Sequence, residues 1–182
     1  MSPVGNGWDL PPGSEPWTNF HWFQPSVSGV LVLVVLSERP TWYTGHYYER
    51  RMCPCLGVGC RLCASGIGAQ VRYCFAVAER STRRVGLIEL GRGNGLLVRD
   101  WAYSRGEMRG LMIEVSKHSR SPQSRTEVQR VHEDAPLWSV GILEPDPSLA
   151  LYLTWHKAGL PMPQKFEEEM SRACLLKADP VG

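Results

Sequence analysis

Most of the chain up to residue 132 alternates short hydrophobic runs with turn-forming residues, a pattern typical of β-strands. The clearest run, at residues 27–36, is rich in β-branched side chains and is bounded by two prolines, which predicts a buried strand. The pattern predicts further strands at residues 41–52, 69–79, 85–90, 108–116 and 126–132. One helical pattern interrupts them at residues 95–104, with Asn94 as its expected N-cap and Gly106 at its end.

The predicted order of strand, strand, strand, helix, strand and strand is the order of an OB-fold barrel. In this order residues 85–90 either extend the third strand or form a separate edge. We therefore predict a mainly β fold with C-terminal helices, in which residues 27–132 form an OB-fold-like barrel. Residues 1–26 are rich in Pro and Gly and are expected to form a flexible arm.

The chain changes character at residue 133. Residues 133–182 carry eight acidic side chains against four basic ones, and two amphipathic helices are expected there, at residues 148–158 and 163–177. We interpret this part as an acidic, helical extension.

The strand predicted at residues 41–52 is not an ordinary half-buried strand. By the two-residue period one face shows Trp42, Thr44, His46, Tyr48 and Arg50, and the other shows Tyr43, Gly45, Tyr47, Glu49 and Arg51. Neither face is aliphatic, so this strand is a candidate binding element.

Directly after this strand, four cysteines lie within eleven residues: Cys53, Cys55, Cys60 and Cys63. Thiolates are the soft, anionic ligands that close a structural zinc site in a tetrahedron. Gly57 and Gly59 can adopt the positive φ that such a tight knuckle requires. The spacing predicts one structural Zn²⁺ in a knuckle at residues 53–63, held by the four cysteines.

His46 is the alternative to Cys53 as fourth ligand. In one extended strand it lies roughly 23 Å from Cys53, and residues 47–52 contain no Gly, Pro, Asn or Asp to turn the chain back. Disulfides are the other interpretation of the cysteines, but they require an oxidising compartment. The N-terminus has no basic start followed by an apolar run, so a cytoplasmic protein with free thiols is expected.

The formal net charge of the whole chain is only +2, but the charge is unevenly distributed. Between Arg39 and Arg130, sixteen Lys or Arg side chains face seven Asp or Glu, a local net charge of +9. A basic body with acidic flanks is typical of a protein that binds a polyanion. Arginines scattered over a solvated surface would give the same count.

The sequence carries no motif for catalysis, and we do not expect an enzyme. Four thiolates would fill the position that a catalytic zinc keeps open for water. The His-x-Glu and Pro-Cys-x-x-Cys pair of nucleic-acid deaminases is missing, as is the Gly-x-Ser-x-Gly elbow of hydrolases. The longest apolar run is far shorter than the ~20 residues of a membrane helix, so no membrane partner is expected.

In the order of its elements and in the knuckle that follows an aromatic, basic strand, the segment 27–132 resembles the single-stranded-DNA-binding proteins of bacteriophages and mobile elements, a group that includes the helix-destabilising protein of T-even phages. In that family a Cys-x-x-Cys pair, matched here by Cys60 and Cys63, closes a zinc site that includes an earlier histidine. The family also ends in an acidic tail; Glu167–Glu169 are acidic here, but the apolar Leu175 and Leu176 follow them.

The resemblance implies sequence-independent binding of single-stranded DNA in replication or recombination inside a bacterial cell. It also implies a replication or recombination protein as partner of the C-terminal region. Whether duplex DNA or RNA is bound as well is left open. The alternative is a zinc-stapled adaptor that joins proteins in a phage or mobile-element complex.

Single strands are held by aromatic platforms for the bases and by basic side chains for the phosphates. The candidate nucleic-acid-binding residues are Trp42, Tyr43, His46, Tyr47, Tyr48, Arg50, Arg51, Arg61, Arg72, Tyr73, Arg80, Arg83, Arg84, Trp101 and Arg109.

Overall fold

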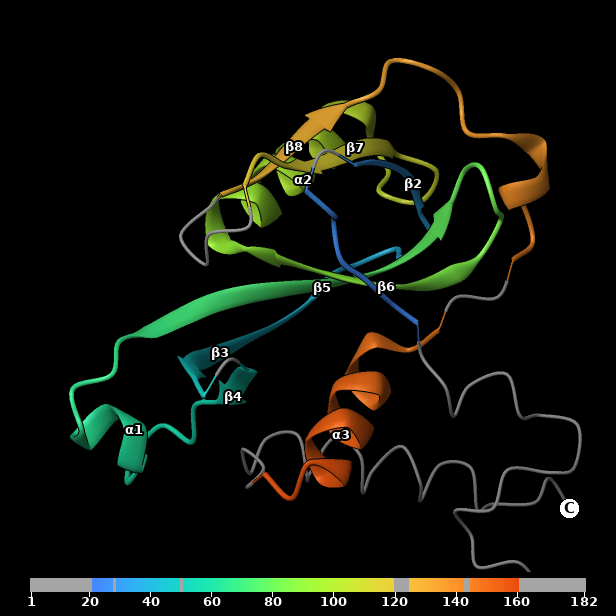
Figure 1. The fold of residues 1–182 in the computed structure, drawn as a ribbon. Helices are drawn as coiled ribbons and strands as arrows, with labels where there is room; N and C mark the ends of the chain where they lie inside the picture. The colour runs from blue at the N-terminus through green and yellow to red at the C-terminus, as the bar shows by residue number, and fades with distance from the viewer. Residues whose placement is uncertain (1–20, 28, 50, 120–124, 143–144, 161–182) are drawn as a thin grey trace, which may run out of the picture.

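The computed structural model describes residues 21–27, 29–49, 51–119, 125–142 and 145–160 (Figure 1). The strands in this part of the chain are β1 (Trp22–Phe23), β2 (Val30–Val35), β3 (Thr41–Tyr48), β4 (Arg51–Pro54), β5 (Ala69–Glu79), β6 (Val85–Gly91), β7 (Met112–Lys117) and β8 (Thr126–Arg130). The helices are α1 (Arg61–Ala64), α2 (Arg92–Arg105) and α3 (Pro147–Lys157), with a 3-10 turn, η2, at Leu137–Ser139.

The sheet is organised around β5, its longest strand, with 11 residues. One edge of β5 pairs with β6 in antiparallel register from Arg72 to Ala78. The other edge is shared: β3 pairs with the first half of β5, up to Cys74, and β2 pairs with its last residues, from Val77 to Glu79. Strand β2 also pairs with β7, and β7 pairs with β8. The sheet therefore divides at β5 into two branches, one of β3 and β4 and the other of β2, β7 and β8.

The main core lies between the branch of β2, β7 and β8 on one side and the strands β5 and β6 on the other. The branch of β2, β7 and β8 lies above β5 and β6 in Figure 1, with α2 beside it. Leu33 of β2, Phe75 of β5, Ile88 of β6, Val98 of α2 and Ile113 of β7 are buried together there. Their inward positions follow the two-residue period of each strand.

A second core covers the opposite face of β5 and β6. Ala76 and Leu87 from these strands pack with Leu151 and Trp155 of α3, all of them buried. Because β5 is covered on both faces, its residues from Cys74 to Ala78 are all fully buried. An uninterrupted buried run of this kind marks a central strand.

The β-rich class is confirmed, but the closure that an OB-type barrel requires is not observed. The sheet is open: it runs in the order β1-β6-β5-β2-β7-β8, and in the described residues β8 pairs only with β7. The first expected strand, β2, does not pair with β3; it pairs with β5 and β7. The predicted strand 85–90 is a separate strand, β6, paired to β5.

The boundaries of the N-terminal arm and of helix α2 also differ from the sequence predictions. Part of the expected arm belongs to the sheet, since β1 pairs in parallel with β6 and Phe23 is buried. Helix α2 begins at Arg92, and Asn94 is not its cap: the Asn94 side chain donates to the carbonyl of Thr126 at 2.6 Å. Gly106 ends the helix in the left-handed conformation, as predicted.

In the C-terminal extension, α3 occupies Pro147–Lys157, where residues 148–158 were predicted as a helix. The second predicted helix, at residues 163–177, and the first 20 residues of the predicted arm lie outside the described residues. None of the described helices is both long and apolar enough to cross a membrane.

Candidate metal centre

The predicted strand 41–52 is in fact a hairpin. Strand β3 ends at Tyr48, the chain reverses, and β4 pairs back with it so that His46 lies opposite Cys53. Glu49 makes the reversal possible with φ of 48°, a left-handed conformation that few non-glycine residues adopt. The turn therefore forms in a stretch that lacks the usual turn residues.

The knuckle after β4 turns on two glycines. Gly57 and Gly59 both have positive φ, at 73° and 82°, as the sequence predicted. The amide of Cys60 donates to the carbonyl of Gly57 at 3.2 Å, and the short helix α1 starts directly after Cys60. This fold places Cys63 one turn after Cys60, so both sulfurs can point back toward the hairpin.

Four ligand atoms from the hairpin and the knuckle converge. The donor atoms of His46, Cys55, Cys60 and Cys63 all lie within 4.8 Å of one another. Nε2 of His46 is 3.5 Å from Sγ of Cys60 and 3.4 Å from Sγ of Cys63. Sγ of Cys55 is 3.5 Å from Sγ of Cys63. A single metal ion could be held between these atoms.

The surroundings of His46 prepare it to be a ligand. The side chain is fully buried, and its Nδ1 lies 2.8 Å from the carbonyl oxygen of Ile67. A carbonyl can only accept, so Nδ1 carries the proton and Nε2 presents its lone pair to the cysteines. Outer contacts of this kind orient metal-binding histidines in many proteins.

The preference for Cys53 over His46 is therefore corrected. Cys53 is buried on β4 opposite His46 but does not belong to the convergent group, and His46 takes its place. The sequence argument assumed that the chain could not double back between Tyr47 and Met52. The hairpin at Glu49 removes that assumption. The other three predicted ligands, Cys55, Cys60 and Cys63, are in the group.

The cysteine thiols influence one another strongly. Hydrogen bonds from backbone amides, chiefly that of Cys63 and then that of Leu56, lower the pKa of the Cys60 thiol to about 6. The hydrogen bond that Cys63 shares with Cys55, together with partial desolvation of this otherwise exposed side chain, raises the pKa of the Cys63 thiol to about 11. Three thiolates at this separation repel one another, and a bound cation would remove that conflict.

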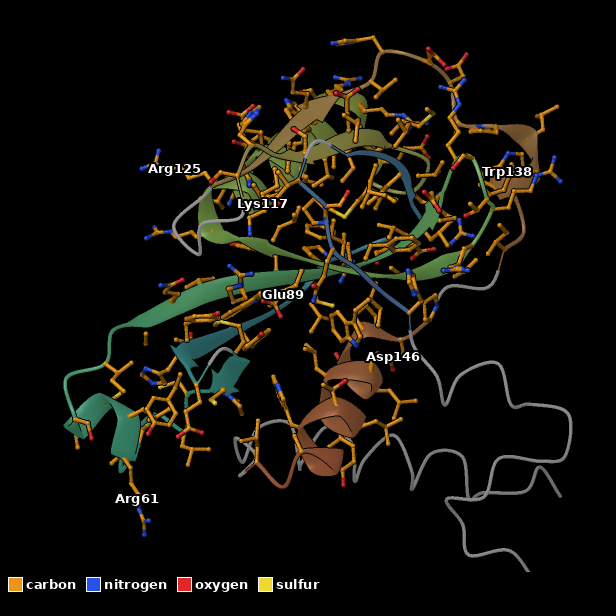
Figure 2. The ribbon with its side chains drawn as sticks, in the orientation of Figure 1. Arg61, Glu89, Lys117, Arg125, Trp138 and Asp146 are labelled. Atoms are coloured by element: carbon orange, nitrogen blue, oxygen red, sulfur yellow. The ribbon has the colours of Figure 1, made fainter. Side chains whose placement is uncertain are left out.

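Three of the predicted base-stacking residues are exposed on the hairpin. Trp42, Tyr47 and Tyr48 have 55%, 53% and 41% of their surface exposed. Tyr47 and Tyr48 directly follow the candidate ligand His46 on β3. Arg61 lies one residue after Cys60, is exposed, and extends outward from α1 in Figure 2. Arg50 and the side chain of Arg51 lie outside the described residues.

Five other predicted binding residues have structural contacts instead. Tyr43 is buried against Trp155 with ring centroids 5.0 Å apart, and its hydroxyl donates to Glu89 at 2.6 Å. Burial and the Glu89 carboxylate raise the pKa of Tyr43 well above its usual value. Arg72 donates to the same carboxylate at 2.6 Å. The remaining three also pack within the fold or contact its backbone: Tyr73, Trp101 and Arg109.

The other predicted arginines lie at the opposite end of β5. Arg80, Arg83 and Arg84 occupy the β5–β6 connection, whereas His46, near the turn of the hairpin, lies opposite Ala69 at the start of β5, about 30 Å away along the strand. Arg80 pairs with Glu133 at 2.8 Å, and the guanidinium of Arg83 lies 5.7 Å from the ring centre of Trp138. These arginines do not form one continuous surface with Tyr47 and Tyr48.

Two groups that contact the predicted site residues were not identified from the sequence. The Ile67 carbonyl that orients His46 is a backbone atom, and no side-chain pattern marks it. Glu89, which binds both Tyr43 and Arg72, is a lone acid in a hydrophobic strand, and its isolation was the available signal.

Comparison with protein-family models, curated proteins and solved structures finds no match for this chain.

Proposed function

We propose that this chain is a zinc-containing protein that binds single-stranded nucleic acid through the β3–β4 hairpin. One observation carries the proposal: three aromatic side chains, Trp42, Tyr47 and Tyr48, are exposed on the same hairpin that supplies two ligands of the metal centre. Large aromatic rings are costly to expose to water unless a partner covers them. Bases stack on such rings regardless of sequence.

Zinc is the metal that fits the donor set best. Three thiolates and one imidazole form a tetrahedral set that zinc prefers in structural sites. With a Zn–S distance of about 2.3 Å and a Zn–N distance of about 2.0–2.1 Å, a tetrahedron places N and S about 3.6 Å apart. The separations of 3.4 and 3.5 Å between Nε2 of His46 and the sulfurs of Cys63 and Cys60 fit this geometry. Four protein ligands leave no position for a reacting water, which supports a structural role.

The metal would fix the hairpin in a binding-competent shape. His46 and Cys55 lie on the two sides of the hairpin, while Cys60 and Cys63 belong to the knuckle. One ion would tie these segments together and hold Tyr47 and Tyr48 in place. Aromatic platforms that are already ordered lose less entropy when a base stacks on them.

The arginines that remain exposed would supply phosphate contacts. Arg61 is the described arginine nearest in sequence to the ligands, and it points into solvent (Figure 2). Arg72 is already paired with Glu89, so not all sixteen basic side chains between Arg39 and Arg130 are available to a nucleic acid. We expect a salt-dependent affinity that involves few phosphates.

The proposal rests on the hairpin and not on an OB barrel. Helix α2 between β6 and β7 preserves the strand–helix–strand order of that fold, but the sheet is open. The resemblance to phage and mobile-element proteins supplies the proposed setting, which is DNA replication or recombination.

Fluorescence anisotropy with labelled oligo-dT and with a matching duplex, each at low and at physiological salt, tests the proposal. We expect micromolar or tighter binding to the single strand, weaker binding to the duplex, and a loss of affinity as salt rises. Equal and feeble affinity for both would contradict it and would favour the protein-adaptor alternative.

A further inference from the structure

We propose that Cys55 and Cys63 form a site of reversible oxidative modification, at which a peroxide converts the two thiolates into a disulfide and expels the metal ion. The inference rests on the proposed metal centre and adds a means of regulating it. It concerns one particular pair among the five described cysteines, all of which are free thiols.

Exposure and distance select this pair. Cys63 is exposed and Cys55 is half-buried, whereas the other two ligands, Cys60 and His46, are buried. The sulfurs of Cys55 and Cys63 lie 3.5 Å apart. A disulfide needs about 2.05 Å, so the two sulfurs must approach by about 1.5 Å once the metal no longer holds them. Gly57 and Gly59 lie between them in the chain and make that movement feasible.

The reaction proceeds in two steps. As a ligand of the metal Cys63 would be deprotonated, and its thiolate sulfur attacks one oxygen of hydrogen peroxide, so that an S–O bond forms, the O–O bond breaks and hydroxide leaves. The Cys55 sulfur then attacks the Cys63 sulfur, so that the S–S bond forms, the S–O bond breaks and a second hydroxide leaves. Two sulfurs lose two electrons and the peroxide gains them; two protons from solvent convert the two hydroxides to water.

The oxidation would remove two of the four ligands at once. His46 and Cys60 alone cannot close a tetrahedral site, so the ion would leave. The tie between the hairpin and the knuckle would then be lost beside Tyr47 and Tyr48. Affinity for a single strand should fall because the stacking residues are no longer held in place.

The other described cysteines are poor competitors. Cys74 is fully buried in the second core, away from oxidant. Cys53 is buried on β4, within the hairpin, and lies outside the convergent group. Cys60 is a ligand, but only 5% of its surface is exposed. A peroxide should therefore meet Cys63 before any of these three.

The test treats the full, metal-loaded chain with increasing hydrogen peroxide. Released zinc is measured with a chromogenic chelator, and the cysteines are mapped by alkylation and peptide mass spectrometry. We expect zinc release in step with a Cys55–Cys63 disulfide, and about a tenfold or greater loss of affinity for labelled oligo-dT. Dithiothreitol with added zinc should restore both the bound zinc and the affinity for oligo-dT. Cys53→Ser is the matched control and should release zinc at the same peroxide concentration.

The outcomes separate this inference from the proposed function. Zinc that is present but stays bound while peroxide oxidises other residues would overturn the oxidation site alone. A bridge that includes Cys60 or Cys53 would overturn it as well. Untreated protein that contains no metal would overturn the metal centre, and with it this inference.

Discussion

His46 joins the candidate metal centre to the rest of the fold through both of its ring nitrogens. Nδ1 donates to the carbonyl of Ile67, just before β5, while Nε2 faces Cys60 and Cys63. One side chain thus links the hairpin, the knuckle and the start of the central strand. Replacing His46 should therefore reduce the bound metal more than replacing its cross-strand neighbour Cys53.

A comparison of two single substitutions tests the ligand assignment. His46→Ala should remove the metal, because three thiolates alone do not complete the tetrahedral set. Cys53→Ser should retain about one zinc per chain, because its sulfur is outside the group. Elemental analysis of protein purified without added metal measures both. Loss of zinc in Cys53→Ser with retention in His46→Ala would restore the four-cysteine interpretation.

Stacking and charge should separate in variants of the hairpin and knuckle. Tyr48→Ala should weaken binding to oligo-dT by about 1–3 kcal/mol with little change in the dependence on salt. Arg61→Ala should reduce the slope of log affinity against log salt by about one, because one phosphate contact is lost. Tyr103 of α2 has 77% of its surface exposed but lies off the hairpin, so Tyr103→Ala is the control. An equal loss in the control would argue against a hairpin site.

Single residues also mark the limit of what the sequence predicts. The cysteine spacing identified three of the four candidate ligands, because cysteines this close in sequence can reach one point, but it could not show that Cys53 lies outside the group. The sequence could not separate exposed from buried aromatics, because Tyr43 is covered by Trp155, more than a hundred residues later. Arg72 is likewise paired with Glu89 only because β5 and β6 lie side by side.

At the scale of elements, α2 depends on a close approach to the sheet. A Cβ added at Gly95 would lie 2.2 Å from the ring of Tyr73 on β5, a distance that real contacts do not allow. A Cβ at Gly93, two residues earlier in the same helix, would meet nothing within 4 Å. The small residue at position 95 therefore lets the helix pack on β5.

Two glycine substitutions test this packing by urea unfolding. Gly95→Ala should lower the free energy of unfolding by about 1–3 kcal/mol, because the helix or Tyr73 must shift. Gly93→Ala should be neutral or raise it by up to about 1 kcal/mol, because alanine favours a helix over glycine. Equal stabilities for both variants would mean that α2 does not pack on Tyr73 as described.

Strands and helices were easier to predict than the pairing between them. Strand β5 and helix α2 follow from hydrophobic runs and from Gly106 at the helix end. The reversal at Glu49 does not, because a left-handed glutamate is stabilised by the completed hairpin and not by local preference. That single turn changed one predicted strand into β3 and β4, and it brought His46 to the metal centre.

At the scale of the whole molecule, the two cores and the metal centre are distinct. Among the described residues, neither core cluster includes a member of the knuckle between Cys53 and Ile67. The sheet is held by burial on both faces of β5 and β6. The metal is therefore expected to order one end of the molecule without being needed for the whole fold.

Hydrogen exchange, measured before and after the metal is removed by a chelator, tests this division. Removing the metal should expose the amides of β4 and α1 to exchange while β2, β5 from Cys74 onward and β7 stay protected, because the cores are untouched. Acid should have the same local effect, because protons compete with the metal for the thiolates. The metal therefore contributes stability at neutral pH that is lost on acidification. A complete loss of protection after chelation would show that the fold depends on the ion.

X-ray absorption at the zinc edge would show directly whether His46, Cys55, Cys60 and Cys63 hold one zinc. We expect three sulfur neighbours at about 2.3 Å and one nitrogen neighbour at about 2.0–2.1 Å. A shell of four sulfurs would show that Cys53, and not His46, completes the site. A protein without bound zinc would contradict the metal centre altogether.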